Sequence, residues 1–173
     1  MEWEKRIPFW DHIVDMTYAF SFLEVGCNAG WNLKALREIS PSMTLCGVDI
    51  NESAVKEARD GAGFTVWNQS AGEPFGHRNF DLVFTAGLLI HIPLEALDRV
   101  MGNIARASRR FVLAVEYADE KEVEVEYRGH TGKLWRRPYG KIYENMDLKL
   151  IDTGLLDKES GFDSCTYWLL KRP

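Results

Sequence analysis

The sequence predicts an α/β fold: a doubly wound sheet of about seven strands, mostly parallel, with an antiparallel strand at the C-terminal end. Three observations lead to this prediction. Short apolar runs alternate with segments of helical spacing, which is the pattern of βα units. A glycine turn follows the first apolar run and opens a helix. The link between the last two apolar runs is short, which favours an antiparallel pair.

The individual elements follow from apolar spacing and from end signals. Apolar runs expected to form strands cover residues 20–25, 43–50, 64–67, 80–84, 111–115, 148–153 and 165–170. We expect helices between the first five strands, and the helical segments are 8–19, 31–39, 52–59 and 93–107. Pro8 suits an early helical position, Asn51 is a good N-cap, and Gly61 is expected to close the helix that Asn51 begins.

Length and charge narrow the class of protein. A chain of 173 residues can bury one core, so we expect a single domain over 1–173, with residues 1–19 as a short N-terminal helical cap. The apolar fraction of 46% and the charged fraction of 27% are typical of a soluble globular protein. A net charge of -5 provides no bulk attraction to a phosphate backbone, so nucleic acid is not an expected partner.

The cysteines and the first residues bear on the compartment. Cys27, Cys46 and Cys165 are widely spaced and form no C-x-x-C pair, so we expect free thiols rather than disulfides, and no metal site. The start of the chain is charged and lacks the apolar core of a signal peptide. No apolar run approaches the roughly 20 residues of a membrane span. These features predict a cytoplasmic protein without a membrane partner.

The most informative segment is the glycine turn after the first strand, Gly26 to Gly30. Gly26 allows a sharp bend, and Gly30 keeps a side chain away from a ligand lying across the loop. Asp49 follows about twenty residues later at the end of the next strand, where an acidic residue can hold ribose hydroxyls. The G-x-G-x-x-G fingerprint of dinucleotide sites is absent, because Cys27 and Asn28 stand where the second glycine would admit a pyrophosphate. The spacing favours a nucleoside ligand without phosphate, such as an adenosyl cofactor with a methionine tail.

Over nearly its whole length the chain resembles class I S-adenosylmethionine-dependent methyltransferases, which have a Rossmann-like fold. The resemblance implies S-adenosyl-L-methionine as cofactor, S-adenosyl-L-homocysteine as product and no metal. It implies that Glu24 lies near the amino group of the cofactor, that the backbone of 26–30 wraps the methionine moiety, and that Asp49 binds the ribose. The residues that it assigns to the cofactor are Glu24, Gly26, Cys27, Asn28, Gly30, Asp49, Ile50, Gln69, Ser70, Ala71, Thr85 and Ala86.

Within this set the later residues have their own implied roles. Ile50 packs on adenine, and residues 69–71 occupy the adenine edge. Thr85 and Ala86 match residues whose backbone meets the methionine amine. Because ligands in an open parallel sheet bind beyond the carboxyl ends of the strands, the residues after strands four and five are expected to face the acceptor.

His91, which follows the fourth strand, is a candidate general base because the unperturbed pKa of histidine lies near neutrality. The alternative is a histidine that packs and hydrogen-bonds to shape the pocket. His130 is a second candidate base. Candidates for acceptor binding are Glu116, Tyr117, Tyr127, Arg128, Lys133 and Arg137.

Several of these candidates lie in residues 118–140, which we expect to form an acceptor-site loop. Two glycines within a basic stretch indicate a formed loop there, and its cations suit an anionic or hydroxyl-rich acceptor, since arginine can fork onto a carboxylate. The alternative is a solvated hairpin anchored in the core by Tyr127 and Trp135.

A finer resemblance concerns five segments. Residues 23–33, 47–51, 89–93, 127–130 and 167–171 are similar to the pseudaminic acid biosynthesis-associated methylases. This resemblance implies methyl transfer to a small molecule, with the hydroxyl or amine of a nonulosonic sugar as one candidate acceptor. We expect the protein to be a monomer or homodimer. Two alternatives stay open: a module that binds the cofactor without catalysis, and a nucleic-acid methyltransferase. The acidic charge disfavours the second, as does Thr85-Ala86-Gly87-Leu88 in place of an Asn/Asp-Pro-Pro-aromatic motif.

Overall fold

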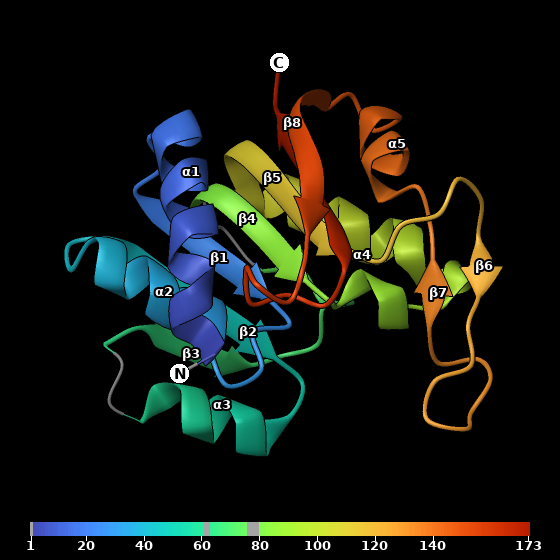
Figure 1. Cartoon of the computed structure of the whole chain (residues 1–173), viewed down its shortest axis with the longest axis horizontal. Coiled ribbons are helices and arrows are strands. Elements are labelled where there is room, and N and C mark those ends of the chain that lie inside the picture. The colour runs from blue at the N-terminus through green and yellow to red at the C-terminus, as the bar shows by residue number, and fades with distance from the viewer. Residues whose placement is uncertain (1, 61–62, 76–79) are drawn as a thin grey trace.

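A computed structural model describes residues 2–60, 63–75 and 80–173, and its main feature is a seven-stranded sheet with the order β3-β2-β1-β4-β5-β9-β8 (Figure 1). Its strands are β1 Ser21–Val25, β2 Thr44–Asp49, β3 Thr65–Asn68, β4 Phe80–Ala86, β5 Ser108–Glu116, β8 Lys149–Leu156 and β9 Cys165–Lys171. Strands β1 to β5 are parallel, and β9 is antiparallel to both β5 and β8. The predicted fold class is confirmed.

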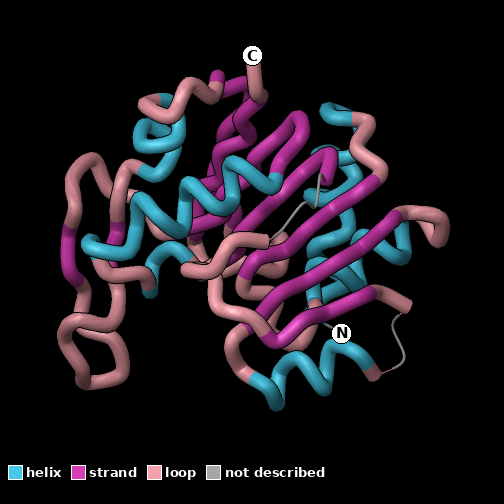
Figure 2. The backbone as a smooth tube through the Cα atoms, turned by 180° about the vertical axis from the view of Figure 1, so that it is seen from behind, coloured by secondary structure: helices cyan, strands magenta, loops and turns pink. Residues whose placement is uncertain are grey.

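Helices cover both faces of the sheet. They are η1 Glu2–Arg6, α1 Ile7–Thr17, α2 Trp31–Ile39, α3 Glu52–Arg59, η2 Leu89–His91, α4 Leu94–Ala107 and α5 Tyr139–Glu144. The first three α-helices pack on one face, and α4 crosses the other face with α5 beside it (Figure 2). Among the described residues, no helix combines the length and the apolar character needed to cross a membrane.

Alternation along the strands builds the two core layers. In β5, Phe111 and Leu113 join the apolar cluster under α1 and α2, whereas Val112 and Ala114 join the cluster under α4. Successive side chains of a strand point to opposite faces, so a strand buried on both sides reads as a continuous apolar run. The central strands were therefore visible in the sequence.

The strand order creates a crevice at one edge of the sheet. Strand β1 has β2 on one side and β4 on the other, so the chain winds outward in both directions from this point. The carboxyl ends of these three parallel strands lead into residues 26–30, 50–51 and 87–88. Ligands of open α/β sheets bind at this kind of switch point.

Three expectations about elements need correction. The connection between β3 and β4 shows turns and no helix over its described residues 69–75, although helices were expected between all of the first five strands. Helix α1 ends at Thr17 rather than at residue 19, because Tyr18 takes a left-handed conformation with φ +47°. Helix α5 was not predicted. Its six residues are too few for apolar periodicity to stand out.

The N-cap of α3 is confirmed. The Asn51 side chain accepts hydrogen bonds from the N–H groups of Ser53 and Ala54 at 3.0 and 3.3 Å. Gly61, which was expected to close this helix, lies outside the described residues.

Residues 118–140 contain a two-stranded ribbon, formed by β6 Val123–Glu124 and β7 Trp135–Arg136. Beyond it, Tyr127 and His130 exchange backbone hydrogen bonds of 2.9 and 3.0 Å. Gly129 and Gly132 take positive φ angles of +79° and +66°, which glycine adopts without steric cost. The expectation of a formed loop without strands is therefore wrong, and the segment is a short hairpin, as in the alternative.

Candidate functional site

The glycine bend, residues 26–30, turns the chain from β1 into α2. Gly26 has φ +79°, and its N–H and that of Cys27 donate to the Val48 carbonyl at 2.8 and 3.0 Å. A Cβ atom at Gly26 would lie 2.9 Å from Cδ1 of Leu88. The position therefore requires glycine for both its dihedral angle and its space.

Asp49 faces this bend. Its Oδ2 accepts a hydrogen bond from the Asn28 N–H at 2.8 Å, and its Oδ1 accepts one from the Asn51 N–H at 2.8 Å. Each carboxylate oxygen retains a further lone pair. The two backbone donors hold the carboxylate at the mouth of the crevice, where it can accept hydrogen bonds from ligand hydroxyls.

Glu24 is a buried acid near the end of β1, with 1% of its surface exposed. Its Oε1 accepts a hydrogen bond from Asn32 Nδ2 at 2.6 Å, whereas its Oε2 is buried without a partner. Burial raises the pKa of Glu24 to about 8, although the Asn32 hydrogen bond and the charge of Arg6 act to lower it. An unpartnered carboxyl oxygen beside a cavity is suited to a cationic donor.

Asn32 is held by two further donors. Arg6 Nη1 and Trp10 Nε1 both donate to Asn32 Oδ1, at 2.9 and 3.2 Å. The side-chain amide is thereby oriented so that its nitrogen points at Glu24. Neither Arg6 nor Asn32 was among the predicted site residues. Their roles depend on side-chain contacts between η1, α1 and α2, for which the sequence carries no signal.

Two cavities adjoin at Gly26. The Glu24 cavity also contains Arg6, Asn28, Trp31 and Ala86. The Ile50 cavity is lined by Asp49, Gln69, Ser70, Ala71 and Leu88 among others. Gly26 belongs to both walls, so a long ligand can pass across it from one cavity to the other.

Two more cavities continue from the Glu24 cavity. The inner Tyr117 cavity shares Arg6 and Ala86 with it, and adds Gly87, Ile90, Tyr117, Phe162, Asp163 and Cys165. The outer cavity shares Tyr117 and Asp163 with the inner one, and adds Arg136, Lys158, Ser164 and Thr166. The four cavities form one row along the carboxyl ends of the parallel strands.

Glu116, at the end of β5, is fully buried and binds the backbone of residues 88–90, which follow β4. Its carboxyl oxygens accept hydrogen bonds from the N–H groups of Leu88, Leu89 and Ile90 at 3.3, 3.1 and 3.3 Å. Burial raises its pKa to about 7, against the lowering effect of these donors. Glu116 itself lines none of the four cavities. It holds Leu88, which lines the Ile50 cavity, and Ile90, which lines the inner Tyr117 cavity.

The predicted bases lie away from the cavities. His91 is exposed on η2, where its Nδ1 lies 2.7 Å from the Lys133 carbonyl oxygen and its ring packs edge-on against Tyr127. His130 is exposed at the end of the hairpin. Neither side chain contributes to the wall of the row of cavities.

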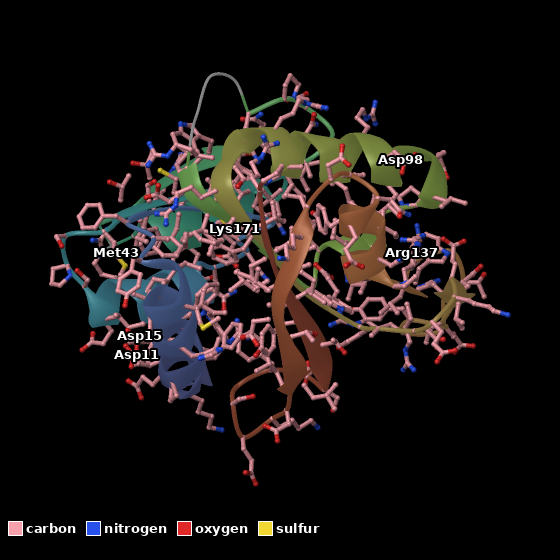
Figure 3. All side chains as sticks on the ribbon, turned by 90° about the horizontal axis from the view of Figure 1, so that it is seen from above. Asp11, Asp15, Met43, Asp98, Arg137 and Lys171 are labelled. Atoms are coloured by element: carbon pink, nitrogen blue, oxygen red, sulfur yellow. The ribbon has the colours of Figure 1, made fainter. Side chains whose placement is uncertain are left out.

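The predicted acceptor residues separate into two groups. Tyr117 lines both the inner and the outer cavity, and burial raises the pKa of its phenol. Arg137 is instead buried, and it donates to Glu122 Oε2 at 2.6 Å and to the Ile92 carbonyl at 2.8 Å. Figure 3 labels it far from Asp11 and Asp15 of α1.

The remaining loop candidates are on or near the hairpin. Arg128 lies over the Tyr127 ring at 5.1 Å, and Lys133 offers its carbonyl to His91. Tyr127, Arg128 and Lys133 line none of the four cavities. Thr85, the remaining cofactor candidate, is buried beneath Ala86 in β4.

The structure is that of an α/β protein with cavities at the carboxyl ends of its parallel strands. Residues 22–110, more than half of the chain, match the family described as "Methyltransferase domain". The protein therefore belongs to the methyltransferase domain family. No curated protein matches the chain.

Solved structures with the same fold include several methyltransferases. The magnesium protoporphyrin IX methyltransferase of Synechocystis PCC 6803, with bound SAM, has 17% identity and a TM-score of 0.70, covering 98% of this chain and 80% of the other. An S-adenosylmethionine-dependent methyltransferase from Clostridium acetobutylicum ATCC 824 has 12% identity and a TM-score of 0.73, with coverages of 98% and 92%. A Burkholderia thailandensis 1,6-didemethyltoxoflavin-N1-methyltransferase has 13% identity and a TM-score of 0.75, with coverages of 98% and 79%.

Proposed function

We propose that this protein binds S-adenosyl-L-methionine across the Glu24 and Ile50 cavities and transfers its methyl group to a small-molecule acceptor in the Tyr117 cavities. The observation that carries the proposal is the buried Oε2 of Glu24, which lacks a partner beside a cavity that continues over Gly26 to Asp49. A ligand with an ammonium group at one end and ribose hydroxyls further along satisfies both acids.

The residues present fit this cofactor in charge and in shape. Glu24 Oε2 would accept from the ammonium, and Asp49 would accept from the ribose hydroxyls. Ile50 is 74% exposed at the rim of its cavity and would pack on one face of adenine. Residues 69–71 would lie along the adenine edge, with the backbone of 85–86 beside the methionine end.

When bound, S-adenosyl-L-methionine supplies a methyl group on a positively charged sulfur, and the carbon–sulfur bond breaks as the acceptor atom bonds to the methyl carbon. The protein contributes alignment, which lowers barriers by holding the acceptor in an attacking geometry. Ala86 and Arg6 border both the cofactor and the acceptor space, so they define where the two ligands meet.

An acceptor hydroxyl or amine must also lose a proton. His91 and His130 were the expected bases, and their side chains do not line the cavities. Tyr117, Asp163 and the thiol of Cys165 are groups on the inner wall that can take part in proton transfer. We therefore favour a base among the residues of the inner cavity.

The finer proposal for the acceptor is a sugar of nonulosonic acid biosynthesis. It is supported by the similarity of five sequence segments to the pseudaminic acid biosynthesis-associated methylases. Two of the fold neighbours are named for different small molecules, magnesium protoporphyrin IX and 1,6-didemethyltoxoflavin. We propose that the protein acts in the cytoplasm, as a monomer or homodimer, without a metal.

Calorimetry with S-adenosyl-L-homocysteine tests cofactor binding. We expect Asp49→Ala and Gly26→Arg to abolish binding, because one removes the ribose acceptor and the other fills the path over the bend. Asp98→Ala is the matched control, since Asp98 is exposed on α4 and lines none of the cavities. Wild-type affinity in both site variants would contradict the proposal.

A second measurement separates an enzyme from a module that only binds the cofactor. The protein is incubated with S-adenosyl-L-methionine and candidate acceptors, and the formation of S-adenosyl-L-homocysteine is followed. Turnover with an amino or hydroxyl sugar supports the enzyme. Binding without turnover across the acceptors favours the non-catalytic alternative.

A further inference from the structure

The outer cavity is larger than the space in which methyl transfer is proposed. It has a volume of about 570 Å³, against about 120 Å³ for the inner Tyr117 cavity. The two share Tyr117 and Asp163, so one ligand can occupy both. An acceptor would then place its reacting atom in the inner cavity and most of its body in the outer one.

Two cations line the outer cavity without a protein partner. Within the described part of the chain, the side chains of Arg136 and Lys158 make no hydrogen bond and no ion pair. Most arginine side chains behave differently. Those that donate to a backbone carbonyl or a carboxylate are Arg6, Arg37, Arg59, Arg109, Arg110, Arg137 and Arg172. A guanidinium kept at a cavity wall without such a partner is available to a ligand.

The neighbouring arginines show how this arises. Side chains alternate between the faces of a strand, and Arg136 ends β7. Arg137 therefore turns inward to Glu122, whereas Arg136 turns to the outer cavity. Of these two adjacent arginines, Arg137 is therefore paired within the protein, whereas Arg136 faces the outer cavity.

The charges along the outer wall favour an anion. Against Arg136 and Lys158 stands one acid, Asp163, and the remaining polar groups are the hydroxyls of Tyr117, Ser164 and Thr166. Hydroxyls can donate to an anion, and arginine binds carboxylate or phosphate through two parallel N–H groups. The chain as a whole carries a net charge of -5, so this wall differs in sign from the rest of the molecule.

We propose that the acceptor carries an anionic group, a carboxylate or a phosphate, which Arg136 and Lys158 hold in the outer cavity while the atom to be methylated lies beside Tyr117. This inference rests on the proposed function, because it assigns a chemical class to the acceptor of that reaction. The reaction is still the methyl transfer from S-adenosyl-L-methionine to an acceptor atom described above.

Amide resonances of isotope-labelled protein, saturated with S-adenosyl-L-homocysteine, test the inference. The probes are acetate, inorganic phosphate and acetamide, the last being a neutral match to acetate, at constant ionic strength. We expect saturable shifts at residues 117–118 and 163–166 with an anion and not with acetamide. The tighter of the two anions identifies the group as carboxylate or phosphate.

Variants make the test specific. Arg136→Gln and Lys158→Gln should each weaken anion binding by about tenfold, as expected for a charged hydrogen bond. Lys149 and Lys171 form the control pair, because they are exposed, lie opposite each other on β8 and β9, and border none of the cavities. Their glutamine variants should leave binding unchanged.

Three results would overturn the inference: acetamide binding as well as acetate, no saturable shift with either anion, or equal shifts around Lys149 and Lys171, which would mark an adventitious ion only. Unchanged anion affinity in the double variant of Arg136 and Lys158 would overturn it as well. If S-adenosyl-L-homocysteine binds while the anions fail, the inference alone is wrong. If S-adenosyl-L-homocysteine itself does not bind, the proposed function fails.

Discussion

The two ends of the row of cavities are built in different ways. The proposed cofactor end, formed by the Glu24 and Ile50 cavities, takes Glu24, Gly26 and Asp49 from 26 consecutive residues that run from β1 to the end of the neighbouring parallel strand β2. The proposed acceptor end, formed by the inner and outer cavities, takes Arg6 from η1, Tyr117 from just after β5, Arg136 from the ribbon and Asp163 from the β8–β9 turn. The first is a local motif, whereas the second exists only after the whole chain has folded.

This difference has an energetic side. At the cofactor end the protein tolerates buried polar groups without full hydrogen bonding, as at Glu24. Such groups cost stability unless a ligand completes them. At the acceptor end the polar groups are largely exposed. Substitutions at the cofactor end should therefore have the larger effects, and the following predictions test that order.

The largest effect is expected from Gly26→Ala. Its φ of +79° and the 2.9 Å approach to Leu88 should together cost about 2–4 kcal/mol of unfolding free energy, from left-handed strain and overpacking. S-adenosyl-L-homocysteine affinity should fall more than about tenfold, since about 1.4 kcal/mol of lost binding energy is enough. Calorimetry and denaturant unfolding measure both.

Gly87→Ala is the matched control for Gly26→Ala. Gly87 has a similar φ of +71°, but a Cβ atom there would meet nothing within 4 Å. We expect only the strain of about 1–2 kcal/mol, with cofactor-product binding retained. Equal losses of binding in the two variants would show that the space beside Leu88 is unimportant.

The second prediction concerns protons at Glu24. With a pKa of about 8, its carboxyl is largely protonated at pH 7 in the ligand-free protein. An ammonium placed against Oε2 favours the carboxylate, so binding of S-adenosyl-L-homocysteine should release close to one proton. Binding enthalpies in buffers of different ionisation heat give this number, and Glu24→Gln should abolish the release. An unchanged proton count in the variant would contradict the role given to Oε2.

The same carboxyl predicts the pH dependence of stability. Its pKa in the folded protein lies above the ordinary 4.5, so the folded state binds the proton more tightly than the unfolded chain. The free energy of unfolding should therefore fall as pH rises from about 5 to about 8. Glu116 acts in the same direction, so Glu24→Gln should remove only part of the slope. Thermal melts of ligand-free protein at several pH values check the sign.

The third prediction is a moderate effect at Arg6, which belongs to both ends. Its Nε donates to the Gly161 carbonyl at 3.0 Å and its Nη1 to Asn32. Arg6→Gln should lower stability by about 1–2 kcal/mol through the loss of these hydrogen bonds, and should weaken cofactor-product binding severalfold. Lys56→Gln, on the exposed side of α3, serves as control. Undiminished binding in Arg6→Gln would show that Arg6 does not contribute to the cofactor cavity.

The smallest effect is expected from His91→Ala. The side chain lies outside the cavities and contacts the hairpin, so cofactor-product affinity should stay within about twofold. Amide exchange in residues 127–133 should rise, because the contact with the Lys133 carbonyl is lost. A large loss of turnover, with no change in the amide exchange of residues 127–133, would instead support His91 as a general base.

The same contrast explains what could be predicted from the sequence. The fold class, the strands near the centre of the sheet and the facing positions of Gly26 and Asp49 depend on short-range patterns, and the structure agrees with them. The places of Arg6 and Asp163 in the site depend on contacts between segments more than a hundred residues apart. The burial of Arg137 depends on which way side chains point at the end of a strand of only two residues. Composition and periodicity carry no information about such contacts.

Glu116 has one more consequence for how the two ends communicate. The segment it fastens presents Leu88 to the Ile50 cavity and Ile90 to the inner Tyr117 cavity. Both ligand spaces therefore rest on three consecutive peptide groups attached to a single carboxyl group. We therefore expect a ligand that moves Leu88 in one cavity to change the position of Ile90 in the other.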